Sequence, residues 1–145
     1  MRLYLESNFV LELALQQQES NQAEQLLALA EKGTIELAIP VFALCEPFST
    51  ISQRSRNRQR LISQLSVELQ DLQRSWLHVP LTKKVEMVAS QLAAIEQSER
   101  NQLEKTISRL INVGRSIPLT ELEFAEALLQ ESRHGLSPQD AIILG

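Results

Sequence analysis

Short apolar runs and helical stripes alternate along the first forty residues of the chain. Leu3–Leu5 is an apolar run short enough for a buried strand, and Phe9–Gln18 carries apolar residues at helical spacing. A second helical stripe follows, with Asn21 and Glu24 placed as a capping box at its start. Thr34–Ile39 then alternates apolar and polar residues before a proline. Two strands joined through helices predict a parallel pair with a right-handed crossover.

The middle of the chain is predicted to be helical. Apolar residues recur every three or four positions from Leu61 to Trp76, and Pro80 is expected to end that helix. Thr82 can cap the next helix. Two further stripes flank the polar stretch Glu96–Gln102, which is either a turn or an exposed part of one long helix.

A short third strand is expected at Arg115–Leu119, followed by a last helix with Thr120 and Glu123 as its capping box. The predicted fold class is therefore α/β, with a small central parallel sheet flanked by helices and an enlarged helical middle section. Residues 1–145 are expected to form a single domain.

Composition agrees with one globular domain. The 145 residues are 43% hydrophobic and 22% charged, which is ordinary for a folded protein. Apolar runs stay well below the ~18 residues of a membrane span, so no membrane contact is expected. A single cysteine, Cys45, fits a cytoplasmic location and is expected to be a small buried side chain. The formal charge of −4 argues against a nucleic-acid binder of the strongly basic kind.

Candidate chemistry lies where polar residues follow the predicted strands. Glu6 and Asn8 come directly after the first strand, and Glu46 lies near the start of the helix after the second. Asp140, one of only two aspartates, precedes a short apolar run. Glu6, Asn8 and Glu46 follow the carboxyl ends of the predicted strands, and open α/β sheets bind their ligands at the carboxyl ends of their strands. The structural alternatives are helix capping for Glu6, a plain surface position for Glu46, and the third position of a helix capped by Ser137 for Asp140.

Three segments taken together resemble the PIN domain, a family of metal-dependent nucleases. Glu6–Asn8 is similar to the family's opening Asp-x-Asn, with Glu in place of Asp. Glu46 has the place of the second acid, and Ser137–Asp140 with the Ala-Ile-Ile that follows resembles the pattern around the third. The matches come in the family's order and span nearly the whole chain, although the middle from about Gln53 to Gly114 carries no family motif.

The resemblance implies a hydrolase that cleaves RNA phosphodiester bonds with Mg²⁺ or Mn²⁺. Glu6, Glu46 and Asp140 would hold the metal, and Asn8 would position a water or a phosphate oxygen. It also implies a homodimer and an antitoxin-type protein partner, since many small members are toxins. Two alternatives stand beside this reading. One is a catalytically decayed PIN-like module that binds a protein or RNA partner, and the other is a purely helical interaction protein.

Two features depart from the family pattern. Glu6 adds one methylene where the family has Asp, which displaces the carboxylate by about a bond length. The family also continues past its third acid, whereas this sequence stops at Gly145. We therefore expect a domain that lacks the end of its last helix and its last strand, cleaves RNA poorly or not at all, and self-associates through the apolar face that the missing helix end would cover.

Arg54, Arg56, Arg58 and Arg60 form the one basic cluster of the sequence. In a helix these side chains spread around the axis, so one interpretation is a solvated helix surface. The other is a set of phosphate contacts beside the acidic site, which would offset the negative overall charge.

Overall fold

The computed structural model describes residues 1–74, 79–118, 120, 121, 125 and 129. Asp140 and most of the predicted last helix, including Glu123, lie outside the described residues. Within the described part, none of the helices is both long and apolar enough to cross a membrane. The elements in chain order are β1 (Arg2–Tyr4), α1 (Ser7–Leu15), α2 (Ser20–Glu31), β2 (Glu36–Pro40), α3 (Val41–Leu72), α4 (Val79–Val113) and β3 (Arg115–Ile117).

The three strands form one parallel sheet in the order β1-β2-β3. Arg2 lies opposite Glu36, and their side chains form an ion pair of 3.1 Å across the strands. Ala38 of β2 lies opposite Arg115 of β3. The predicted α/β class, the parallel pairing of the first two strands and the short third strand are confirmed. The sheet rules out the purely helical reading of the sequence.

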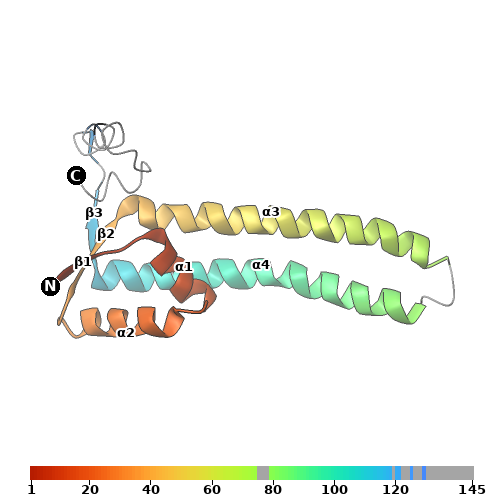
Figure 1. The fold of residues 1–145 in the computed structure, drawn as a ribbon, viewed down its shortest axis with the longest axis horizontal. Coiled ribbons are helices and arrows are strands. Elements are labelled where there is room, and N and C mark those ends of the chain that lie inside the picture. Colours follow the sequence, from red (N-terminus) through yellow and green to blue (C-terminus); the bar gives the residue numbers. More distant parts are fainter. Residues whose placement is uncertain (75–78, 119, 122–124, 126–128, 130–145) are drawn as a thin grey trace.

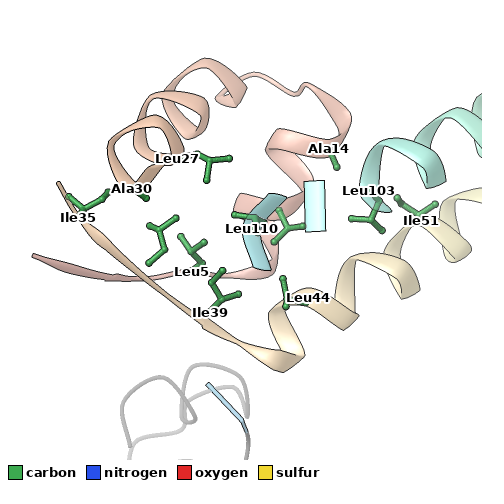
Figure 2. Close-up of a cluster of buried hydrophobic side chains, with 12 residues drawn as sticks. Leu5, Ala14, Leu27, Ala30, Ile35, Ile39, Leu44, Ile51, Leu103 and Leu110 are labelled. Atoms are coloured by element: carbon green, nitrogen blue, oxygen red, sulfur yellow. The ribbon is translucent and has the colours of Figure 1, made fainter. Parts of the chain in front are cut away.

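The central strand β2 is buried on both of its faces. Leu37 and Ile39 are fully buried in the main apolar cluster, and Ala38 and Pro40, which alternate with them, are buried too. Figure 2 shows that this cluster gathers side chains from the central strand β2 and from helices α1 to α4. The core therefore lies where the sheet meets the helices, and it fixes the ends of the strands from which the candidate residues project.

Helices α3 and α4 form a long antiparallel hairpin that extends away from the sheet (Figure 1). The polar stretch Glu96–Gln102 belongs to α4, so one long helix is correct and a turn is not. The 35 residues of α4 make it about 52 Å long at 1.5 Å per residue. Helix α1 contacts both helices of the hairpin close to the sheet, and α2 contacts α4. We call residues 60–72 of α3 and 79–97 of α4 the distal hairpin.

The ends of the first two helices differ from the prediction. Helix α1 stops before Gln16, which adopts a left-handed conformation with φ of 50° and closes the helix earlier than the expected end at Gln18. The predicted capping box at the start of α2 is wrong, because no side chain caps this helix at Ser20. Glu24 instead forms an ion pair with Arg109 of α4. Glu24, which the local spacing predicted to cap α2, thus makes a tertiary contact instead.

The tip of the hairpin also differs from the prediction. Helix α3 ends at Leu72, earlier than the expected boundary at Pro80. Helix α4 begins at Val79, so Pro80 lies in its first turn, where a missing N–H costs no helical hydrogen bond. Thr82 lies inside α4 and is buried, so its predicted capping role is wrong.

Candidate functional site

Glu6 and Asn8 stand at the carboxyl end of β1, where the strand gives way to α1. Glu6 is the residue directly before α1, and its backbone carbonyl accepts a hydrogen bond of 3.1 Å from the Phe9 N–H. Its carboxylate makes no capping hydrogen bond to the helix, so capping does not account for this acid. The side chains of Glu6 and Asn8 are both exposed. They are placed to meet a ligand from solvent.

Glu46 lies in the second turn of α3, directly after β2, and is half-buried. The next residue, Pro47, sits inside the helix and is buried. Because proline has no N–H, it cannot donate to the carbonyl of Ala43, one turn earlier. The helix backbone is therefore less tightly bonded around Glu46 than elsewhere in α3.

The register of the sheet brings the end of β1, with Glu6 and Asn8, and the start of α3 to the same carboxyl edge of the sheet. The Leu5 N–H donates to the Ala38 carbonyl at 3.0 Å, so Glu6 comes level with the last residues of β2. Helix α3 begins directly after that strand and carries Glu46 about 9 Å further along its axis. The carboxyl ends of β1 and β2 thus present Glu6, Asn8 and the first turns of α3 on one side of the sheet.

The third predicted ligand is Asp140, which lies outside the described residues. Among the described residues, no group of three or more His, Cys, Asp or Glu side chains is arranged to hold a metal ion. Glu6 and Glu46 supply hard carboxylate oxygens of the kind that Mg²⁺ and Mn²⁺ prefer, and Asn8 adds an amide. The donor types fit such an ion, but a complete set needs a further acid.

A groove of about 570 Å³ runs beside β1 and contains Glu6 and Asn8. Phe9 is one of its apolar lining residues, and Glu12 and Glu19 add acids to its wall. Glu46 is not among the residues that line it. Sequence reasoning missed these two acids, although Glu12 follows Asn8 by four residues and so shares its face of α1. Glu12 also has a structural part, because its Oε2 accepts a hydrogen bond of 2.9 Å from the Glu19 N–H.

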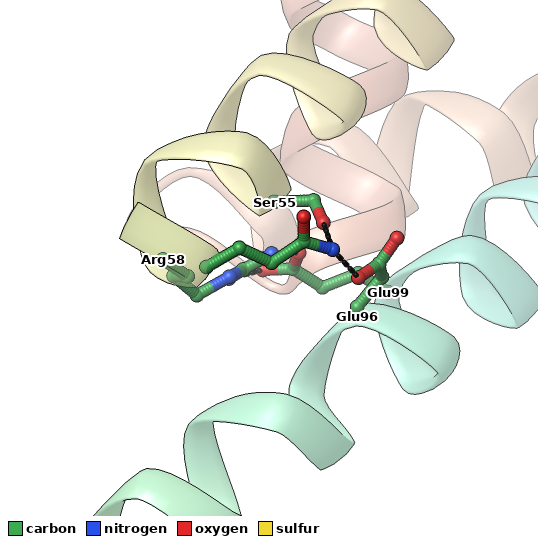
Figure 3. A network of polar contacts seen from close by, with 5 residues as sticks. Ser55, Arg58, Glu96 and Glu99 are labelled. Atoms are coloured by element: carbon green, nitrogen blue, oxygen red, sulfur yellow. Dashed lines mark hydrogen bonds and ion pairs between the residues drawn. The ribbon is translucent and has the colours of Figure 1, made fainter. Parts of the chain in front are cut away.

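The basic cluster divides into one structural arginine and three on the surface. Arg58 donates from both of its terminal nitrogens to the Glu99 carboxylate, which ties α3 to α4 (Figure 3). That hydrogen bond raises the pKa of the Arg58 guanidinium. Arg56 donates to the Gln53 side chain on the same helix at 2.7 Å and is exposed. As expected for a helix, the four arginines do not form one basic face. The two remaining exposed members of the cluster are Arg54 and Arg60.

Cys45 is exposed, so its prediction as a small buried side chain is wrong. The reason is its position on α3, because the buried side of this segment carries Ala43, Leu44 and Pro47. Cys45 lies between those positions in sequence but is turned outward by the helical period.

Comparison with protein-family models, curated proteins and solved structures finds no match for this chain. Two carboxylates and an amide at one sheet edge, with a groove on one side and exposed arginines further along α3, suit a ligand that is anionic and bound through a divalent cation.

Proposed function

We propose that this protein is a PIN-like nuclease that hydrolyses RNA phosphodiester bonds with Mg²⁺ or Mn²⁺. The observation that carries the proposal is the shared edge of the sheet. Glu6 and Asn8 follow β1, and Glu46 follows β2, which is the parallel neighbour of β1. The same three residues are those on which the resemblance to the family rests.

The carboxylates of Glu6 and Glu46, completed by Asp140, are the proposed metal ligands. Acids that share a site repel one another, so each has a higher proton affinity until a cation neutralises them. A bound divalent ion would supply charge neutralisation at the scissile phosphate and a more acidic water. Asn8 is the second residue of α1 and would donate its amide N–H groups to a phosphate oxygen.

The exposed arginines of α3 are the proposed contacts to the RNA backbone. Arg54 follows Glu46 by eight residues, which places it about 12 Å further along the helix. Phosphates flanking the scissile one could reach Arg54, Arg56 and Arg60, whereas Arg58 is held by Glu99. Such contacts position the RNA strand and make its binding sensitive to salt. The positive charge of these arginines also offsets, at this surface, the formal charge of −4.

The test is RNA cleavage by the purified chain with Mg²⁺ or Mn²⁺. We expect slow cleavage that stops when the metal is chelated and falls at least about tenfold in Glu6→Gln, Glu46→Gln and Asp140→Asn. Glu68→Gln is the matched control, because Glu68 is an exposed acid on the distal hairpin. Cleavage that survives all three substitutions would refute the proposed site.

A second candidate is a catalytically decayed PIN-like module that binds a protein or RNA partner through its helical middle. The long α3–α4 hairpin favours it, because a hairpin of this length serves no purpose in holding Glu6 or Glu46. An antitoxin-type protein is one such partner. This candidate predicts partner binding without cleavage and without dependence on a divalent metal, so the cleavage assay separates the two.

A further inference from the structure

One face of the distal hairpin carries a strip of apolar side chains that the described part of the molecule leaves open to solvent. Four of its members are between 38% and 50% exposed, although they are large aliphatic residues. A small hydrophobic side chain alone on a surface needs no explanation, but a strip shared by two helices does. The apolar strip consists of Leu61, Leu65 and Leu72 on α3 and of Leu81, Val88 and Ile95 on α4.

The spacing of these residues places them on one side of each helix. Leu81, Val88 and Ile95 follow one another at seven-residue steps, the repeat with which a helix presents a seam to a neighbour. Two pairs of contacting residues fix how the helices run past each other. Arg58 binds Glu99, and the Gln73 amide donates to Glu86 at 2.8 Å. Leu61 therefore lies level with Ile95, and the two halves of the strip run side by side.

The strip continues a face of α4 that is already used as a helix interface. One heptad beyond Ile95 comes Gln102, and one further heptad on comes Arg109. Both residues line a groove of about 650 Å³ that is shared with α1 and α2. Arg109 also binds two acids of α2, Glu24 and Glu31. Near the sheet, this side of α4 therefore has helices packed on it, and along the distal hairpin it has none among the described residues.

The same continuity holds on α3. Arg54 lies one heptad before Leu61, and its Nη1 lies 3.2 Å from the side-chain amide of Gln17, just past the end of α1. Helix α1 contacts both α3 and α4 (Figure 1) and so occupies the near end of the face that carries the apolar strip. The strip begins where α1 stops.

We propose that a second copy of this chain covers the apolar strip and closes an antiparallel four-helix bundle. The exposed surface is two helices wide, and a second hairpin is the matching surface that the chain itself provides. A two-fold axis lets the same strip serve both copies. Packing two hairpins through such seams gives the arrangement of a four-helix bundle.

The position of α1 determines the orientation of the pair. Because α1 stands on this face near the sheet, the sheet ends of two copies cannot lie side by side on it. The copies therefore meet in opposite directions, each sheet end lying beyond the tip of the other hairpin. With Val88 at the two-fold axis, Leu81 of one copy faces Ile95 of the other. The fourteen residue steps from Leu81 to Ile95 give a seam about 21 Å long, which suits a dimer that dissociates on dilution.

The first test compares substitutions on and off the apolar strip. Val88→Lys and Ile95→Lys are expected to weaken dimerisation at least about tenfold in sedimentation equilibrium. Val67→Lys and Met87→Lys are matched controls, because both residues are exposed but are turned away from the strip by about 100° or more. Helix content and melting temperature show whether each variant is folded. A wild-type chain that stays monomeric, or equal losses in both sets, would overturn the proposal.

The second test fixes the orientation without destabilising the fold. In a Cys45→Ser background, a chain with Leu81→Cys is mixed with a chain with Ile95→Cys, and oxidised glutathione is added. The antiparallel bundle predicts a disulfide between residues 81 and 95 of different copies and little linkage of residue 95 to itself. Preferential linkage of residue 95 to residue 95 would contradict the bundle, which places these two residues about 21 Å apart along the seam. An absence of any linkage beyond that of Met87→Cys, whose cysteine is turned away from the strip, would do the same.

Discussion

Arg109 on α4 donates from its Nε to the Glu31 carboxylate on α2 across 2.6 Å. The same guanidinium also binds Glu24, two helical turns earlier on α2. The contact is between side chains that are both partly exposed, so it is screened by solvent and salt. The contact fixes the position of α2 on α4, because the two helices have few other polar contacts among the described residues.

This ion pair predicts a dependence of stability on pH. The hydrogen bond from Arg109 lowers the pKa of Glu31 below its ordinary value of 4.5. A lowered pKa in the folded state adds stability above pH 4.5, and that contribution is lost as the pH falls through the folded-state pKa. Thermal melts should show Glu31→Gln less stable than wild type near neutral pH, with the difference shrinking in acid and in high salt. A difference that grows in acid would contradict the assigned pair.

Gly114 is predicted to be intolerant of any side chain. A Cβ at this position would lie 2.9 Å from Ile39 Cγ1, closer still to Ile39 Cδ1, and 3.2 Å from the Leu110 carbonyl oxygen. Since Ile39 is fully buried in β2, Gly114→Ala should destabilise the fold by about 1–3 kcal/mol in denaturant unfolding.

The clash itself is tested by combining that substitution with Ile39→Val, which removes Cδ1. The double variant should lose less than the sum of the two single variants. Gly33→Ala is the control, because Gly33 has a φ of +72° and open space around it. It should cost about 1 kcal/mol through backbone strain alone, and Ile39→Val should not relieve it. Additive losses at residues 114 and 39 would show that the close approach is absent.

The brace between α3 and α4 is predicted to need arginine rather than any cation. Arg58 and Glu99 are both partly buried, and the planar guanidinium meets the carboxylate with two nitrogens. Arg58→Ala leaves Glu99 without that partner and should cost about 1–3 kcal/mol. Arg58→Lys should recover only part of this loss, because an ammonium group cannot make the paired contact. Full recovery with lysine in chemical denaturation would argue against the two-point geometry.

The exposed arginines should behave in the opposite way. Arg56→Ala and Arg60→Ala are expected to leave the melting temperature almost unchanged, since both side chains are exposed. Each should weaken binding of single-stranded RNA and reduce the slope of log affinity against log salt by about 0.7, as for a lost phosphate contact. Binding that is insensitive to both substitutions would remove the arginines of α3 from the RNA path.

The fold was predictable where local patterns and tertiary structure agree. Leu3–Leu5 and the alternation around Leu37 and Ile39 placed two strands, and their separation by helices implied parallel pairing. The long α4 was not predictable, because its polar stretch reads equally as a turn. That stretch is held in helix by the heptad series that continues through it, with Leu103 fully buried just beyond.

The candidate site was predictable only in part. The positions of Glu6, Asn8 and Glu46 after adjacent strands follow from the chain order alone. The pairing of Glu24 with Arg109 joins residues 85 positions apart, so the local spacing wrongly suggested a cap. The outward turn of Cys45 depends on which side of α3 meets the core, and sequence spacing around Ala43 and Leu44 does not fix this.

Metal binding tests, independently of catalytic rate, whether Glu6, Glu46 and Asp140 together form one divalent-metal site. Calorimetric titration with Mn²⁺ should show one ion per chain. Glu6→Gln, Glu46→Gln and Asp140→Asn should each weaken its affinity at least about tenfold, and Glu68→Gln should leave it unchanged. If Mn²⁺ does not bind, or if it binds equally well when Glu6 and Glu46 are neutralised, the carboxyl edge of this sheet is not a metal site.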